Sequence, residues 1–433
     1  MDTLPVELLC AISTRVCKKD VFACSSVSQL WRQITLPLLF SNLRIQVRKE
    51  EILSRGSFLD ETDSDDPVTL DWHRSKSHIL LPSFLAFLRH RPDVAASVRS
   101  LALTQSDEVS LAWDTTTSTH TETMLLVLNQ LPSLANLKLV NVVVGGNYQP
   151  SRELVRHIDD LSIICPSADQ SSPESLMRLL GLFRSVSALS LIGIGIEEIP
   201  PVMDNVSMAG WPLPQYAPKH LEIIYIDCPL KPLFSAMLLS RTLLQRVESL
   251  KMDEVECEDS DIDVFGRLIA QMSSSLVYFE APDFLPEVLQ DTLLARLPKL
   301  ETLHVRLRYH CYSDPARLLS TVRRNPNIRT VILEFQFPYA MPGKAKTMRQ
   351  EAAQFITAWE DILLAWATTN SQNRVILVFD NDDEPHERDW PLFDEYVLHY
   401  ADMFPRLREK GILKLKLNPD EARHIQFTLC HLR

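Results

Sequence analysis

Three acidic residues late in the chain, Asp380, Asp382 and Glu384, have the spacing with which a calcium-binding loop begins. Such a loop needs a glycine at its sixth place, for a sharp turn, and a bidentate glutamate at its twelfth. Those places hold Pro385 and Pro391. The pattern therefore indicates a solvated loop and no calcium site.

Other residues that could do chemistry also lack the partners that the chemistry requires. His304, His310 and Cys311 lie close in sequence, but no CxxC or HExxH spacing accompanies them, so a zinc site is not expected. There is no GxSxG motif, and no Cys–His pair has an identifiable orienting residue. Glycines number only ten, which disfavours phosphate-binding loops. We expect no catalytic residue, no metal and no cofactor.

Composition and charge narrow the possible partners. The chain has 433 residues, of which 45% are hydrophobic and 23% charged, with a net charge of −12. Residues 1–50 hold seven Lys and Arg against four Asp and Glu, so this segment is +3 and the remainder −15. An acidic body does not suit a nucleic-acid backbone, whereas a basic N-terminal segment suits an acidic protein partner. The eight cysteines have no paired spacing, which favours free thiols.

No apolar run reaches the length of about 18 residues that a membrane span requires. We therefore expect no membrane partner, and a cytoplasmic and/or nuclear location.

The elements that must position any binding residues begin with residues 4–45. Pro5 suits the first turn of a helix, because its missing N–H has no helical partner there. Apolar residues at helical spacing follow it, and Asp20 can cap a second helix. Ser25 or Ser26 can open a third helix, which Pro37 is expected to end. These short helices carry more large apolar side chains than their own core can use, which predicts a partner surface.

The ordered pattern LPxExL, an isoleucine, an aspartate and then VSxxWR resembles an F-box, the opening module of substrate receptors in Skp–cullin–F-box ubiquitin ligases. The resemblance implies that the segment binds a Skp-type adaptor and, through it, a cullin. The alternative is an ordinary helical cap on a larger fold. The expected adaptor-binding residues are Leu4, Pro5, Leu8, Ile12, Val27, Trp31, Leu39 and Phe40.

From about residue 80 onward, a motif of an apolar residue, two variable residues and then apolar–x–apolar returns eleven times, in steps of 24 to 45 residues. Helical patterns lie between the copies, and a period of this size is typical of a solenoid. The copies are Val98–Leu101–Leu103, Leu134–Leu137–Leu139, Ile158–Leu161–Ile163, Val186–Leu189–Leu191, Leu221–Ile224–Ile226, Val247–Leu250–Met252, Leu276–Phe279–Ala281, Leu300–Leu303–Val305, Ile328–Val331–Leu333, a looser Ile376–Val378, and Ile412–Leu415–Leu417.

This pattern resembles a degenerate leucine-rich repeat, and with the F-box it looks like the large F-box families of fungi. We expect an α/β fold in which a three-helix F-box is followed by an irregular solenoid, with parallel strands on the concave side and helices on the convex side. The asparagine of the repeat family is mostly missing, so the turns need other hydrogen bonds. A doubly wound α/β fold is the alternative.

The expected domains are an F-box at 1–46, a partly acidic linker at 47–80 and the repeat domain at 81–433. The last repeats are atypical, with longer helices expected at about 347–368 and 390–407.

The repeat family often binds its targets on the concave side, to which the residues between the anchors of LxxLxL point. The alternative is that these are ordinary exposed strand positions. The chain as a whole is expected to be the non-catalytic substrate-recognition subunit of an SCF-type ligase. Its rivals are a non-ligase repeat scaffold and an enzyme on an α/β fold. The expected target-binding residues are Lys138, Ser190, Tyr225, Lys251, Glu280, His304, Arg306 and Glu334.

Overall fold

The structure is a computed structural model of the whole chain. It divides into two compact units, Met1–Ala217 (unit 1) and Pro218–Arg433 (unit 2). No helix in the described part of the chain is long and apolar enough to cross a bilayer. The residues that the structure describes are 9, 12–13, 15–16, 18–47, 81–105, 119–142, 144–145, 155–164, 176, 179–194, 218–224, 230–239, 241–253, 255, 259–282, 285, 287–307, 316–336, 356–380 and 404–417.

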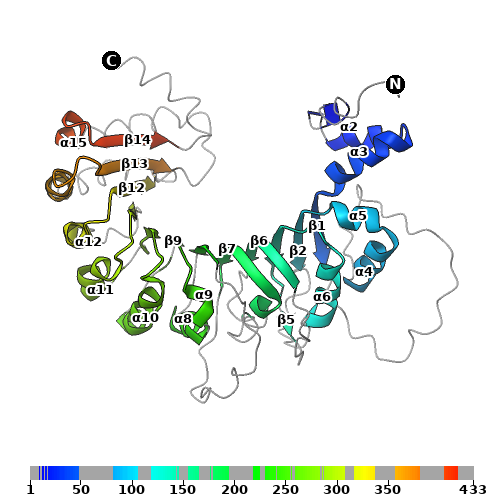
Figure 1. Cartoon of the computed structure of the whole chain (residues 1–433), viewed down its shortest axis with the longest axis horizontal. Helices are drawn as coiled ribbons and strands as arrows, with labels where there is room; N and C mark the ends of the chain where they lie inside the picture. Colours follow the sequence, from blue (N-terminus) through cyan, green and yellow to red (C-terminus); the bar gives the residue numbers. More distant parts are fainter. Residues whose placement is uncertain are drawn as a thin grey trace, which may run out of the picture. The chain divides into compact units, whose positions relative to one another are not determined.

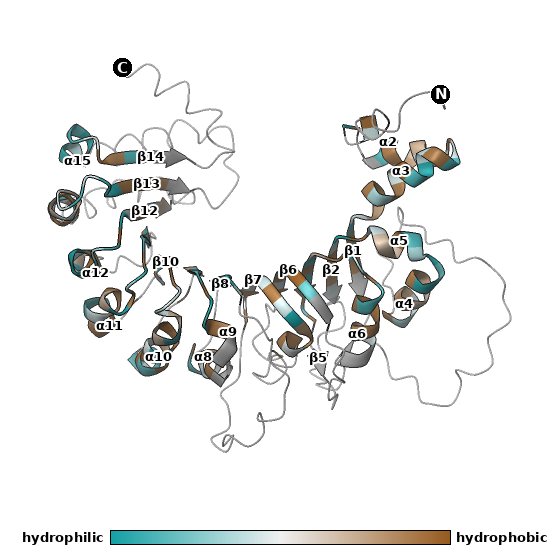
Figure 2. Cartoon of the chain, in the orientation of Figure 1, coloured by the Kyte–Doolittle hydropathy of each residue, from teal (hydrophilic) through white to brown (hydrophobic). Residues whose placement is uncertain are grey.

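Unit 1 begins with two packed helices, α2 (Lys18–Ser25) and α3 (Gln29–Phe40). Ser28 caps α3 by accepting a hydrogen bond from the Trp31 amide, so the cap is Ser28 and neither of the two serines expected from the sequence. The helix continues through Pro37 to Phe40. The expectation that Pro37 ends it was therefore wrong. Hydrophobic residues recur along α3 (Figure 2).

Parallel strands follow in unit 1. The order of strands in its sheet is β1-β2-β4-β6-β7, so each strand lies beside the next main strand along the chain. Strand β1 begins at Asn42, within the segment 1–46 predicted as the N-terminal domain, and pairs with β2. The strands are β1 (Asn42–Val47), β2 (Ser100–Gln105), β4 (Asn136–Val140), β6 (Val155–Ile164) and β7 (Phe183–Ile192), with a separate pair β3 (Thr119–His120) and β5 (Val144–Gly145). The helices are α4 (Leu81–His90), α5 (Pro92–Ser97) and α6 (Thr121–Asn129).

Unit 2 repeats the same arrangement, and its described residues form seven parallel strands in chain order, β8 to β14. Helices α8 and α10 to α12 lie on one side of strands β9 to β12 (Figure 1). The strands are β8 (His220–Ile224), β9 (Ser249–Asp253), β10 (Tyr278–Glu280), β11 (Thr302–Leu307), β12 (Thr330–Gln336), β13 (Arg374–Asp380) and β14 (Leu413–Leu417). The helices are α8 (Leu230–Leu239), α9 (Arg241–Leu244), α10 (Ile262–Met272), α11 (Glu287–Thr292), α12 (Ala316–Thr321) and α15 (Pro405–Glu409), with short 3-10 turns η2 (Asp259–Asp261), η3 (Leu294–Arg296) and η4 (Val322–Arg324).

The strand order within each unit distinguishes the two folds expected from the sequence. A doubly wound sheet reverses its strand order at a switch point. Neither unit does so, and the α/β class with N-terminal helices followed by parallel strands is confirmed. The long helix expected at about 347–368 is present over 356–367, where it buries Trp359, Leu363 and Trp366.

The repeat motif supplies the core, because its last two apolar residues point to the helix side. Leu303 and Val305, for example, pair with Val331 and Leu333 of the next strand, and all four are buried. We call the opposite side, to which the residues between these anchors point, the inner face.

In two copies of the motif, the residues that the sequence indicated as core anchors were wrong. On β8 the buried anchors are Leu221 and Ile223, which pair with Leu250 and Met252, and not Ile224. On β13 the anchors are Val375 and Leu377, where the sequence had indicated Ile376 and Val378. Because side chains alternate between the two faces, a shift of one residue exchanges the core and inner-face positions.

Backbone hydrogen bonds connect the turns where an asparagine ladder is missing. The carbonyl oxygen of the residue before one strand accepts hydrogen bonds from two backbone amides of the following repeat. Glu301 O, for example, accepts from Arg329 N (2.9 Å) and Thr330 N (3.0 Å). The same pairing recurs with the carbonyls of Ser41, Arg99, Ala135, Lys219, Glu248 and Val277.

Asn325 adds a side-chain bridge between repeats. It is 4% exposed, and its Nδ2 donates to Leu297 O (2.7 Å) and Leu294 O (3.0 Å) of the preceding repeat. Its Oδ1 accepts from the Asn327 amide. Asn325 directly precedes Pro326, between the helical segment and the next strand. Its side chain therefore bridges the two repeats at this junction.

The first prediction concerns this bridge. Asn325→Ala should destabilise unit 2 by about 1–3 kcal/mol, because two buried hydrogen bonds are lost without replacement by water. Hydrogen exchange of β11 and β12 amides measures the change. Asn327→Ala, at an exposed neighbour, is the control and should have a smaller effect. Equal protection in Asn325→Ala and the wild type would contradict the bridge.

Candidate functional site

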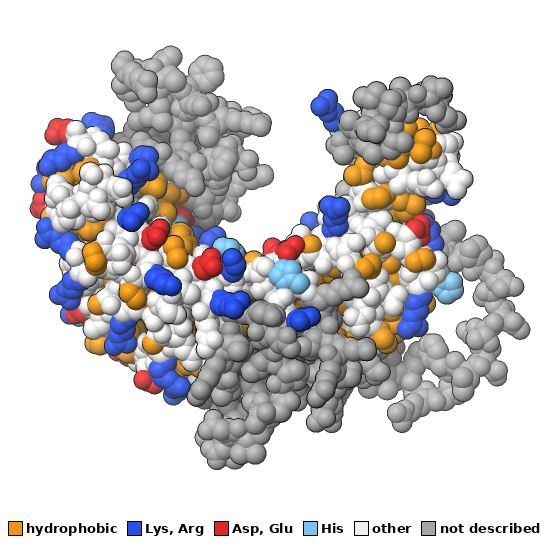
Figure 3. Space-filling view, in the orientation of Figure 1, with side chains coloured by type: hydrophobic (Ala, Val, Ile, Leu, Met, Phe, Trp, Pro, Cys, Tyr) orange, Lys and Arg blue, Asp and Glu red, His pale blue; other side chains and the backbone are white. Residues whose placement is uncertain are grey.

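The N-terminal helices expose several large apolar side chains. Ile12 is 43% exposed, Phe22 54% and Val27 63%. Across the described ranges of the chain, only two further large hydrophobic residues are exposed, Leu126 at 38% and Val288 at 63%. Three of the five therefore lie within sixteen residues of the N-terminal segment. Hydrophobic side chains are visible at the surface of this segment (Figure 3).

The same segment has a small core of its own. Leu9 is 1% exposed, Val21 4% and Trp31 7%. Thr35, one helical turn after Trp31, is also buried, and its hydroxyl donates a hydrogen bond to Trp31 O at 2.7 Å. The segment thus divides its apolar residues between an internal core and an exposed set.

The expected adaptor-binding residues fall into different environments. Ile12 and Val27 are exposed, Leu39 and Phe40 are half-buried, and Trp31 is buried. Leu4, Pro5 and Leu8 lie outside the described residues. Phe22 was not among the predicted contacts, because its apolar character alone does not tell which way it faces.

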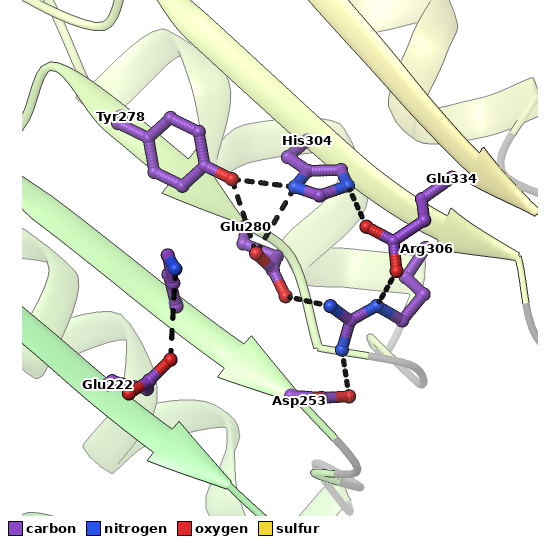
Figure 4. A network of polar contacts seen from close by, with 8 residues as sticks. Glu222, Asp253, Tyr278, Glu280, His304, Arg306 and Glu334 are labelled. Atoms are coloured by element: carbon purple, nitrogen blue, oxygen red, sulfur yellow. Dashed lines mark hydrogen bonds and ion pairs between the residues drawn. The ribbon is translucent and has the colours of Figure 1, made fainter. Parts of the chain in front are cut away.

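The second candidate site is a cluster of charged side chains on the inner face of unit 2. Neighbouring strands place Glu280 beside His304 and Arg306 beside Glu334. Tyr278 of β10 and Asp253 of β9 complete the cluster (Figure 4). The side chains of Glu280, His304 and Glu334 are only 3%, 8% and 6% exposed. A face that the sequence suggested would be open is therefore closed at this point.

Arg306 holds the cluster together. Its Nη2 lies 3.1 Å from Glu280 Oε1, its Nε lies 2.6 Å from Glu334 Oε1, and its Nη1 contacts Asp253. The three carboxylates come from β10, β12 and β9, while Arg306 itself lies on β11. One guanidinium fork thus connects four adjacent strands, which a single-point ammonium charge cannot do.

His304 has a carboxylate at each ring nitrogen. Its Nδ1 lies 3.1 Å from Glu280 Oε2, and its Nε2 lies 2.9 Å from Glu334 Oε2. The Tyr278 hydroxyl lies 2.6 Å from the same Nδ1, and it donates to Glu280 Oε2 at 3.2 Å. An imidazolium can donate to both carboxylates at once.

These contacts shift the pKa of each group so that its charged form is favoured. Burial opposes the charged form of His304, but the hydrogen bonds and charges of Glu280 and Glu334 outweigh it, so the His304 pKa is raised. Burial likewise opposes ionisation of Glu280 and Glu334, yet His304 and Arg306 hold the pKa of both carboxyls below its ordinary value. The pKa of Arg306 is raised, because the carboxylates outweigh its burial.

The other expected target-binding residues lie on the inner faces of the two units. Lys138 on β4 is exposed and Ser190 on β7 is half-buried. Lys251 on β9 is 48% exposed, and its Nζ lies 3.7 Å from Glu222 Oε1. Tyr225 lies outside the described residues. Since β8 has its anchors at Leu221 and Ile223, Glu222 is the residue of this strand that points to the inner face.

A serine–histidine–aspartate set lies on the inner face of unit 1. Ser185 Oγ is 2.6 Å from His157 Nδ1, and His157 Nε2 is 3.0 Å from Asp159 Oδ1. The order nucleophile, base, orienter is that of acyl-transfer enzymes, which also need amide donors for an oxyanion. Here β6 and β7 pair with each other along their length, and His157 and Asp159 are 52% and 64% exposed. The set is therefore better explained as hydrogen bonding between solvated strand residues.

Among the described residues, no group of three or more His, Cys, Asp or Glu is placed to hold a metal ion. Asp380 ends β13. The other residues weighed as metal ligands lie outside the described residues: His310, Cys311, Asp382 and Glu384. The linker residues 48–80 also lie outside them.

Residues 1–40 match the F-box domain family. Comparison with curated proteins gives no match for the chain. The matched segment contains α2 and α3 and ends where α3 ends, two residues before β1 begins. The exposed residues Ile12, Phe22 and Val27 lie within it. The chain therefore carries a segment that matches the F-box domain family, at residues 1–40, ahead of a parallel α/β array.

Proposed function

We propose that this protein is the substrate-recognition subunit of an SCF-type ubiquitin ligase, in which the F-box domain binds a Skp-type adaptor and the strand array binds a target protein. The observation that carries the proposal is the exposed apolar set Ile12, Phe22 and Val27 within the matched domain. Exposed apolar residues gathered on a small domain are typical of a protein-binding surface. In such a complex the receptor raises the local concentration of target lysines near an enzyme held elsewhere.

The adaptor-binding surface of this proposal is centred on Ile12, Phe22 and Val27. Leu4, Pro5, Leu8, Leu39 and Phe40 remain predicted contacts. Trp31 enters the proposal differently, since at 7% exposure it supports the surface from within. The positive charge of the segment favours an acidic partner by faster association.

Charged substitutions at exposed apolar residues test the proposal, with Val27 and Val288 as a pair matched in exposure. Val27→Asp and Phe22→Asp should each weaken binding to a purified Skp-type adaptor by at least about tenfold, because a charge enters an apolar contact. The measurement is titration calorimetry on the full chain. Val288→Asp is the control, because Val288 is 63% exposed as Val27 is, but lies on α11 of unit 2.

Adaptor affinity unchanged by both N-terminal variants would contradict docking through this surface. A loss of the same size in Val288→Asp would show that the effect is not specific to the F-box. The same titration separates the ligase receptor from a repeat scaffold without a ligase, which has no reason to bind the adaptor.

Target binding is proposed for the solvent-accessible part of the inner face of each unit. Lys138 and Ser190 lie on the inner face of unit 1 and Lys251 on that of unit 2, and their charge and hydrogen-bonding capacity suit protein contacts. The side chains of Glu280, His304 and Glu334 are buried and bonded to one another, so a target could reach them only if the cluster opened.

A further inference from the structure

When His304 is neutral, the inner-face cluster has fewer hydrogen-bond donor protons than its acceptor atoms need. Three atoms lie within hydrogen-bonding reach of each other: Tyr278 OH, His304 Nδ1 and Glu280 Oε2, at 2.6, 3.1 and 3.2 Å. With His304 protonated, the triangle holds two protons, on Nδ1 and on the tyrosine oxygen. Nδ1–H can then donate to Glu280 while the Tyr278 hydroxyl donates to the same carboxylate oxygen.

Loss of the Nδ1 proton leaves one proton for the triangle. The Tyr278 hydroxyl then donates either to Nδ1 or to Glu280, and the other acceptor is left without a donor inside the triangle. A buried acceptor without a donor is unfavourable. Nε2, which lies 2.9 Å from Glu334 Oε2, keeps its proton in both states, so the change falls on the contact between β11 and β10.

The charges around His304 act in the same direction. Asp253 of β9, Glu280 of β10 and Glu334 of β12 are acidic, and Arg306 of β11 is the other cation of the cluster; Tyr278 of β10 is neutral. Protonated His304 gives two cations against three carboxylates, and neutral His304 leaves one cation against three. Arg306 stays charged throughout, so His304 is the group of the cluster whose charge can change near neutral pH.

We propose that His304 is a proton-dependent lock on the inner face of unit 2. When both ring nitrogens are protonated, His304 contacts Glu280 of β10 and Glu334 of β12 at once. Release of the Nδ1 proton breaks the contact with β10. The proposal does not depend on adaptor binding. It places a pH-sensitive element in the face proposed for targets, because Lys251 and Asp253 lie on the same face of β9.

The sign of the pH dependence follows from the pKa directions. The raised pKa of His304 gives stability that is fully present below the unfolded value of about 6.5 and is lost as the pH rises through the folded value. The lowered pKa values of Glu280 and Glu334 give stability that is present above about 4.5 and is lost on acidification. Protection of β10 to β12 should therefore be greatest in mildly acidic solution and fall as the solution becomes alkaline.

The test is a histidine titration by NMR on the full chain with carbon-13 at the imidazole Cε1. The resonance lost in His304→Gln identifies His304. Its midpoint should lie above the ordinary value of 6.5, and Glu280→Gln or Glu334→Gln should lower it. A midpoint at or below the ordinary value, or one that neither glutamine variant moves, would overturn the proposal.

Hydrogen exchange of the wild-type chain gives a second readout that needs no variant to fold. After correction for the intrinsic pH dependence of exchange, amides of β10 to β12 should lose protection above the His304 midpoint, while those of β6 and β7 should not. His157→Gln, at a histidine 52% exposed in unit 1, is the control and should leave this pattern unchanged. Uniform protection of β10 to β12 across the His304 midpoint would count against the lock.

Discussion

Replacing Arg306 by alanine is expected to destabilise unit 2 by about 3–5 kcal/mol, because it leaves buried carboxylates without their counter-charge. Glu280 and Glu334 are nearly inaccessible to water, and each bonds to the guanidinium. Asp253 loses its contact with Arg306 as well. Hydrogen exchange of β9 to β12 amides measures the loss within unit 2 itself, which matters because a chain of two units need not unfold in one step.

Two further variants separate charge from geometry at this position. Arg306→Lys keeps the charge but cannot reach three carboxylates with one fork, so it should recover only part of the stability. Arg317→Ala is the matched control: Arg317 also forms a two-point contact with a carboxylate, Asp291, but the two are 43% and 40% exposed. An exposed pair of this kind contributes little to stability because water screens it, so Arg317→Ala should destabilise unit 2 far less. Equal effects of Arg306→Ala and Arg317→Ala would contradict the account of the cluster.

Replacing Trp31 by alanine is expected to unfold the F-box domain, with a cost of about 3–5 kcal/mol for the lost core side chain. Among the described residues, Trp31 is the largest buried hydrophobic side chain of this domain, beside Leu9 and Val21, and so small a domain has little stability to spare. Adaptor binding should be lost together with the helix signal and protease resistance of residues 18–40. Phe22→Asp, in contrast, should lose adaptor binding while α2 and α3 remain protected.

The comparison of these two variants is itself informative. If Trp31→Ala lost the adaptor but kept α2 and α3 protected, Trp31 would be a contact residue and its burial in the free chain would have misled us. If Phe22→Asp unfolded the helices, the exposed set would be part of the core.

The sequence predicted the repeats well where apolar and polar residues alternate. The motif Leu300–Leu303–Val305 is framed by Glu301, His304 and Arg306, so the core side of β11 was readable. The frames failed at β8 and β13, where Ile223 and Ile224, or Val375 to Val378, form uninterrupted apolar runs. The alternation of apolar and polar residues that marks the two faces of a strand cannot be seen in such a run. Only pairing with the neighbouring strand fixes the register.

The charged cluster was only partly predictable. Alternation placed Glu280, His304, Arg306 and Glu334 on one face, and the structure confirms that they lie together on adjacent strands. Their burial could not be predicted, because it depends on what covers the face and not on the strands that carry it. Pairing of opposite charges at matching repeat positions was the available signal for their mutual contacts.

For the F-box domain, the motif indicated the domain but not the direction of its side chains. Trp31 and Val27 are four residues apart in one pattern, yet one is buried and the other is 63% exposed. A residue four positions away lies on nearly the same helical face, but Val27 precedes the Ser28 cap and so lies outside α3. Only the local turn separates the two roles.

The central claim is that the F-box domain of the intact chain binds a Skp-type adaptor through its apolar surface. Calorimetric titration of the purified full chain with the purified adaptor tests it most directly. The account predicts a one-to-one complex with a negative heat-capacity change, the mark of apolar surface removed from water. A folded chain that gives no complex, or one whose formation shows no heat-capacity change, would contradict it.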